Sequence, residues 1–166
     1  MVSKKKAFCD GFTLLEVMIV VVIAVTVTMF AVPSFKKSQA RTQYMAASGV
    51  LVELATATQM LIEEYPALEI SSAAFSSNTA DYSSVPTAST AAAWMLGKQY
   101  LGKVDFQSKK YKGYSFSFST EGTANCGTKC TKAGAIACMV NLNHMTQAYQ
   151  CAWVSREDGM LHNLEN

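Results

Sequence analysis

Charged residues are scarce in this chain of 166 residues, because they make up 16% of it, against roughly 25% in an average soluble domain. Histidine occurs only twice, as His144 and His162, and neither lies in a metal-ligand spacing. The sequence lacks a Walker loop, a dinucleotide fingerprint and a Gly-x-Ser-x-Gly motif. We therefore expect no enzymatic activity, no cofactor and no metal site.

Apolar residues make up half of the chain and concentrate near its N-terminus. The run from 12 to 32 carries one charge, Glu16, and Pro33 follows it directly. At about 1.5 Å per helical residue the run spans about 30 Å, which is one bilayer core. Three lysines at positions 4–6 precede it, which predicts a cytoplasmic N-terminus and export of the remainder.

Glu16 is the feature that an ordinary membrane segment leaves unexplained. A cleavable secretory signal would be shorter and would end on small residues, which the sequence at Pro33 does not match. A plain single-pass anchor explains the length and orientation. A carboxylate at this depth, however, costs about 2.5–3.5 kcal/mol on insertion scales, so it needs a partner.

The first 60 residues resemble the class III signal of type IV prepilins and type II secretion pseudopilins. They share the lysines, the sequence from Gly11 and Phe12 through Glu16, the apolar run and Pro33. The resemblance implies that a prepilin peptidase cleaves between Gly11 and Phe12 and N-methylates the new Phe12 amine. It also implies that Glu16 neutralises this amine on a neighbouring subunit during assembly, and that Pro33 kinks the helix.

The function implied by the resemblance is structural. A type IV pilin-like subunit is inserted in the inner membrane as a single-pass precursor, meets an assembly platform there, and polymerises with other pilin subunits into an extracellular filament. Such filaments serve adhesion, motility or DNA uptake. A pseudopilin of a type II secretion system, with a periplasmic filament, is one alternative. An unprocessed single-pass binding domain is another.

The sequence after the membrane segment predicts an α+β fold of the type IV pilin kind. Apolar side chains recur every three or four residues from Ala47 to Tyr65, which predicts a helix with one buried face that ends near Glu64, before Pro66. This helix would pack on an antiparallel sheet of three or four strands. The expected segments are a leader at 1–11, a membrane and assembly half of the helix at 12–33, an amphipathic half at 34–65, a connecting region at 66–102 with a possible helix at 91–101, and the sheet with a polar tail at 103–166.

Four of the five cysteines lie in the last 41 residues of the exported part, which predicts disulfides. Alternating apolar residues predict strands around Cys138 and Cys151, and a tight turn at His144 and Met145 would place these two cysteines opposite each other. We therefore expect one disulfide between Cys138 and Cys151 and another between Cys126 and Cys130. The other two pairings remain open. A zinc site formed by the four cysteines is the alternative to disulfides.

Charge argues against binding of nucleic acid. Without the four charged residues of the leader, the chain carries 11 basic and 11 acidic side chains, whereas a nucleic-acid binder needs a basic face. One local group of lysines is interleaved with aromatic residues. It consists of Lys98, Lys103, Lys109, Lys110 and Lys112 with Tyr100, Phe106, Tyr111 and Tyr114. We interpret it as a solvated loop and strand edge.

Overall fold

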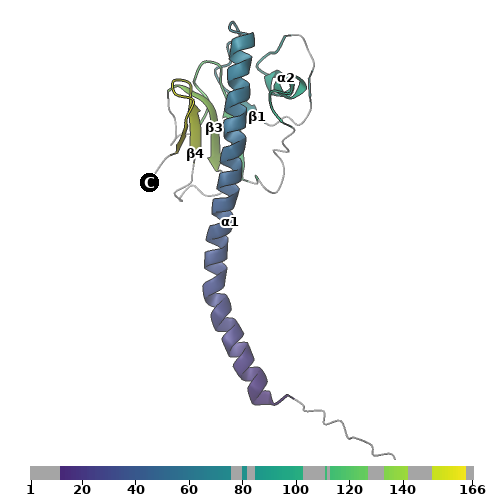
Figure 1. Cartoon of the computed structure of the whole chain (residues 1–166), viewed down its shortest axis with the longest axis vertical. Coiled ribbons are helices and arrows are strands. Elements are labelled where there is room, and N and C mark those ends of the chain that lie inside the picture. The colour runs from purple at the N-terminus through teal and green to yellow at the C-terminus, as the bar shows by residue number, and fades with distance from the viewer. Residues whose placement is uncertain are drawn as a thin grey trace, which may run out of the picture. The chain divides into compact units, whose positions relative to one another are not determined.

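A computed structural model describes residues 12–75, 80–81, 85–102, 111, 113–126, 133–141 and 151–163. The architecture is α+β, with a long helix, α1 (Leu14–Glu64), packed on an antiparallel sheet (Figure 1). The sheet has five strands in the order β1-β2-β3-β4-β5. They are β1 (Ala73–Phe75), β2 (Tyr114–Phe118), β3 (Ala135–Asn141), β4 (Cys151–Ser155) and β5 (Leu161–Asn163). A short helix, α2 (Ala91–Gly97), lies within the predicted range 91–101.

The chain divides into two compact units, one ending at Arg41 and the other beginning at Thr42. The first holds the N-terminal half of α1, and the second holds the C-terminal half with the sheet and α2. Helix α1 continues through Pro33 and ends at Glu64. The predicted end is therefore confirmed, and Pro66 accounts for it because proline disfavours helical geometry in the residue before it.

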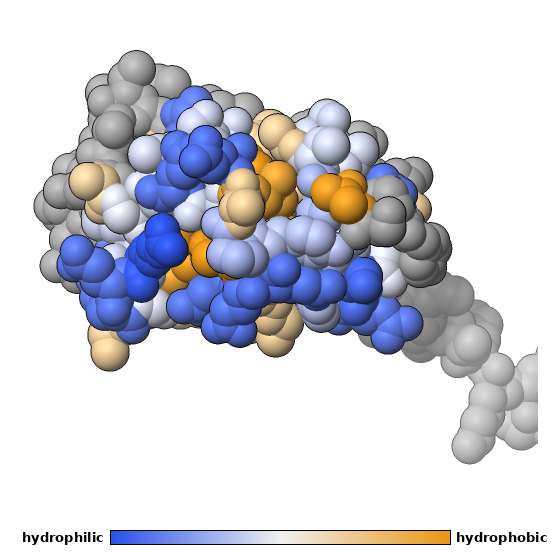
Figure 2. Space-filling view, turned by 90° about the horizontal axis from the view of Figure 1, so that it is seen from above, coloured by the Kyte–Doolittle hydropathy of each residue, from blue (hydrophilic) through white to orange (hydrophobic). Residues whose placement is uncertain are grey.

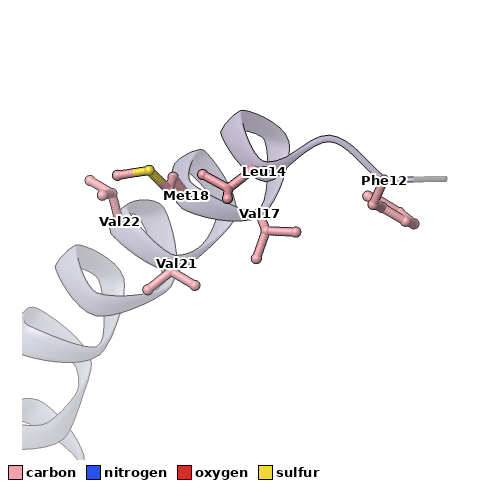
Figure 3. A pocket seen from close by; sticks show the side chains of 6 residues that line it. All are labelled: Phe12, Leu14, Val17, Met18, Val21 and Val22. Carbon is pink, nitrogen blue, oxygen red and sulfur yellow. The ribbon is translucent and has the colours of Figure 1, made fainter.

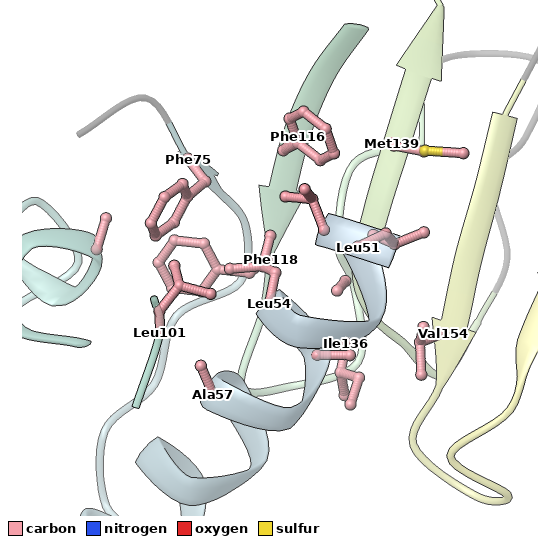
Figure 4. Packing of buried hydrophobic residues seen from close by; sticks show 14 of the residues in the cluster. Leu51, Leu54, Ala57, Phe75, Leu101, Phe116, Phe118, Ile136, Met139 and Val154 are labelled. Atoms are coloured by element: carbon pink, nitrogen blue, oxygen red, sulfur yellow. The ribbon is translucent and has the colours of Figure 1, made fainter. Parts of the chain in front are cut away.

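The core of the second unit lies between α1 and one face of the sheet (Figure 4). The predicted buried face of the helix is confirmed, since Leu51, Leu54 and Leu61 are fully buried. Phe118 on β2 and Met139 on β3 are also fully buried in this cluster. Each such side chain contributes about 1.5–3 kcal/mol by leaving water, so this layer fixes the helix on the sheet.

Strands β1 and β5 were not predicted from the sequence. Strand β1 lies in a stretch rich in Ser and Ala that we interpreted as connecting loop, and β5 lies in the segment that we interpreted as a polar tail. Both are edge strands of three residues, and each pairs with a longer neighbour. Such short segments carry too little alternation to be detected, because their pairing depends on the strand beside them.

The predicted register between β3 and β4 is wrong by two residues. Val140, not Cys138, lies opposite Cys151, and Cys138 lies opposite Trp153. A shift of two keeps Cys138 and Val140 on the same face, so the alternation alone does not distinguish the two registers. The predicted turn at His144 and Met145 lies outside the described residues.

Strand β3 is buried on both faces. Ala137 and Met139 belong to the core under α1, whereas Cys138 packs with Ala124 and Cys151 in a second cluster on the opposite face. A register shift between Ala135 and Ala137 marks a bulge in the pairing with β4. The segment that contains Ala124 thus covers the sheet face that the helix leaves open.

Candidate functional site

The N-terminal half of α1 is an uncovered apolar helix. Every residue from 12 to 39 is exposed, with side chains such as Phe30 82% and Ile23 57% accessible. By length and composition α1 can cross a membrane, and its most apolar window is not buried at all. An exposed apolar surface of this extent calls for lipid or another protein surface as its cover.

One face of the second unit is different in character. The face seen in Figure 2 is mostly hydrophilic, with hydrophobic residues in small separate spots. Such scattered apolar residues are normal for a surface in water. The contrast places the candidate site on the N-terminal half of α1.

Thr13 and Glu16 form the start of this helix. The backbone N–H of Glu16 donates to the Thr13 hydroxyl at 3.2 Å and to the Thr13 carbonyl at 3.1 Å. A threonine followed three residues later by a glutamate is the capping-box pattern, a start signal that our prediction did not include. The Glu16 carboxylate therefore lies in the first turn, where the helix dipole stabilises a negative charge.

Phe12 precedes the helix and is 80% exposed. Its ring, together with five side chains from the first turns of α1, lines a shallow apolar hollow (Figure 3). The five are Leu14, Val17, Met18, Val21 and Val22. Their spacing of three and four residues makes them one stripe, as in helices that pack against a neighbouring helix. Gly11, the predicted partner of Phe12 at the cleavage site, lies outside the described residues.

The hydroxyl groups of Thr26 and Thr28, within the apolar run, are satisfied inside the helix. The hydroxyl of Thr26 donates to the Ile23 carbonyl at 2.8 Å, and that of Thr28 donates to the Ala24 carbonyl at 2.6 Å. Pro33 lies inside the helix without a backbone N–H to donate. Such internal bonding suits a segment that enters a medium without water. The predicted kink at Pro33 stays a prediction.

The predicted cysteine pairing is wrong. Cys126 forms a disulfide with Cys138, with their Cα atoms 5.4 Å apart. Cys151 is disulfide-bonded as well, so neither the predicted bond between Cys138 and Cys151 nor that between Cys126 and Cys130 is present. The register explains the error, because Cys138 and Cys151 are diagonal neighbours rather than an opposed pair. Cys130 lies outside the described residues.

The structure describes one lysine of the lysine group, Lys98, and this side chain is engaged in contacts within the chain. Lys98 pairs with Glu64 at 3.5 Å and lies 5.3 Å from the ring centroid of Trp94. The Tyr100 hydroxyl donates a hydrogen bond to the same carboxylate, which raises the pKa of Tyr100. This cluster fastens the region after α2 to the last turn of α1. Lys103, Lys109, Lys110, Lys112 and Phe106 lie outside the described residues.

His162 lies in strand β5. Its Nε2 atom lies 3.0 Å from Asp158, and its ring stacks on Trp153. The Asp158 carboxylate also accepts the backbone N–H of Met160, which lowers its pKa together with His162. The described part of the chain contains no cluster of three or more His, Cys, Asp or Glu side chains that could hold a metal. His144 lies outside it.

The comparisons with known proteins give no relative for this arrangement. The chain matches no protein-family model, no curated protein and no solved structure.

Proposed function

We propose that this chain is a type IV pilin-like subunit, inserted in the inner membrane and then polymerised into an extracellular filament. The observation that carries the proposal is the division of α1. Its C-terminal half is built into a core, whereas its N-terminal half is apolar and exposed on every side. In this role lipid covers the exposed half before assembly, and neighbouring helices cover it afterwards.

Phe12 and Glu16 have distinct roles in the proposed assembly. Cleavage after Gly11 would leave a positively charged, N-methylated amine on Phe12. That amine needs an anion in an apolar filament core, and Glu16 of a neighbouring subunit supplies it. Thr13, as the cap of α1, sets the position of Glu16 in the first turn. A homopolymer of such subunits has a fixed axial register because each ion pair forms at only one stagger.

The first experiment measures the N-terminal sequence and intact mass of the protein in sheared surface material and in membranes. A chain that begins at N-methylated Phe12 in the sheared fraction supports the filament subunit. The same chain found only in membranes favours a pseudopilin. An intact leader in both fractions overturns the proposal in favour of a membrane-anchored binding domain.

The Glu16→Gln variant tests the register. It keeps the size of the side chain and the Thr13 cap but removes the charge, so we expect normal membrane insertion and cleavage with at least tenfold fewer filaments. The readout is the ratio of sheared to membrane-bound processed protein, with Lys36→Gln as an exposed control on the same helix. Normal filament yield with Glu16→Gln as the only subunit would refute the role of this charge.

A further inference from the structure

A second apolar face lies on the C-terminal half of α1, on the side away from the sheet. Met45, Val52 and Met60 are 56%, 44% and 42% exposed. Gly49 and Thr56 lie between them on the same side, at steps of three or four residues. The Thr56 hydroxyl donates to the Val52 carbonyl at 3.0 Å, so its donor is satisfied within the helix. The face is therefore an uncharged strip of about 22 Å, from Met45 to Met60.

No close packing within the described part of the subunit requires a glycine at position 49. A Cβ atom at this position would meet nothing within 4 Å. Glycine in an exposed helix costs about 1 kcal/mol relative to alanine. A glycine on an apolar helix face lets the backbone or a large side chain of another helix approach closely. The observation therefore points to a helical occupant that contacts α1 at Gly49.

The chain itself carries a helix of the required chemistry. Val20, Ile23, Val27 and Phe30 share one side of the N-terminal half of α1, and each is more than half exposed. Lys37 lies near the same side, beyond the apolar residues. It forms no ion pair within the described part of the chain, and neither does Glu63, which follows the strip of Met45 to Met60.

We propose that the N-terminal half of one copy lies, in parallel, on the strip from Met45 to Met60 of a second copy. In this alignment Lys37 of the first copy meets Glu63 of the second, and Ile23 fills the space above Gly49. The two copies are then staggered by about 26 residues, or about 39 Å along the helix. They are therefore a different pair of neighbours from the pair joined by the Phe12 amine and Glu16. Parallel packing follows from the common orientation of all copies in one membrane. The inference rests on the proposed function and adds the contact and its register.

Cysteine cross-linking in the full chain tests the contact directly. Ile23→Cys and Gly49→Cys are introduced together, and the Gly49→Cys change is tolerated because the site is open. Oxidation should give a ladder of cross-linked subunits. The control combines Val22→Cys with Gly49→Cys, in which the first cysteine is rotated by about 100° from the contact, and should give no ladder.

Charge reversal tests the register through a second contact. We expect Lys37→Glu and Glu63→Lys each to lower filament yield, by about fivefold for a contact of this kind, and the double variant to restore it. Lys36→Glu combined with Glu63→Lys should not restore it, because Lys36 lies on another side of the helix. Restoration by Lys36→Glu instead would overturn the proposed alignment.

The outcomes separate this inference from the proposed function. Filaments that form without the ladder from Ile23→Cys and Gly49→Cys overturn the contact and leave the filament subunit standing. A ladder in membranes with no filaments supports the contact and overturns export as a filament. If neither filaments nor the cross-linked ladder form, the proposed contact and the proposed function are both refuted.

Discussion

Removal of the disulfide between Cys126 and Cys138 gives a quantitative test of the second unit. The bond closes a loop with a sequence separation of 12 residues. The chain-entropy relation then assigns it about 3 kcal/mol, mainly through the unfolded state. Both cysteines are at most 1% exposed, so replacement by alanine introduces no polar group into the cluster.

The assay is urea unfolding of the full chain in detergent, monitored by tryptophan fluorescence. Trp94 and Trp153 both lie in the second unit. With a slope of about 1–3 kcal/mol per molar urea, the Cys126→Ala and Cys138→Ala double variant should unfold about 1–3 M earlier. The control variant replaces Cys126 and Cys151, which belong to different bonds. It therefore removes two bonds and leaves the partner of each cysteine unpaired.

Comparison of the single replacements with the double replacement tests the pairing itself. If Cys126 and Cys138 are bonded, either single replacement already abolishes the bond, so the double variant loses little more than each single variant. Additive losses from the two single replacements would refute the pairing. Peptide mapping without reduction should also link Cys126 to Cys138. By exclusion it should link Cys151 to Cys130, the remaining cysteine of the last 41 residues. A fragment joining Cys138 to Cys151 would refute both assignments.

Three further changes test contacts of the second unit by unfolding. Asp158→Asn should destabilise the chain at neutral pH, because a carboxylate with a lowered pKa stabilises the fold only when ionised. The difference should begin to shrink below about pH 3.9 and be lost as the pH falls through the lowered pKa of Asp158. Tyr100→Phe should destabilise it at neutral pH by removing the bond to Glu64. The difference should begin to shrink above about pH 10 and be lost as the pH rises through the raised pKa of Tyr100. Thr120→Val should cost about 1–3 kcal/mol in urea unfolding, since the buried hydroxyl bonds two backbone groups of the segment after α1, at 2.7 and 2.8 Å. An unchanged midpoint in any of the three would contradict the contact that it tests.

The sequence was sufficient where one physical signal acted alone. Leu51, Leu54 and Leu61 recur at helical spacing beside polar residues, so the buried face of α1 was predictable. Pro66 likewise determined the end of the helix. Each of these features depends on nearby residues in the chain and not on partners far away in the sequence.

The sequence was insufficient where one pattern of apolar residues is compatible with more than one structure. In β3 both alternating sets are apolar, with Met139 in one and Cys138 in the other, so neither the core face nor the register follows from the pattern. The pairing of Cys138 failed for this reason. At Thr13 the signal was present, but the capping pattern overlapped the motif that we attributed to processing.

The two halves of α1 require different sources of stability in the proposed filament. The C-terminal half keeps its core whether or not the chain is assembled, because that core lies within the second unit. The N-terminal half gains little from the hydrophobic effect when it leaves lipid, because lipid tails are as apolar as the helices that replace them. Polar groups and close packing must therefore determine whether the N-terminal half of α1 is more stable in lipid or in the filament. Glu16, Lys37 and the open site at Gly49 are the positions where this sequence supplies them, which is why their replacement should affect assembly more than membrane insertion.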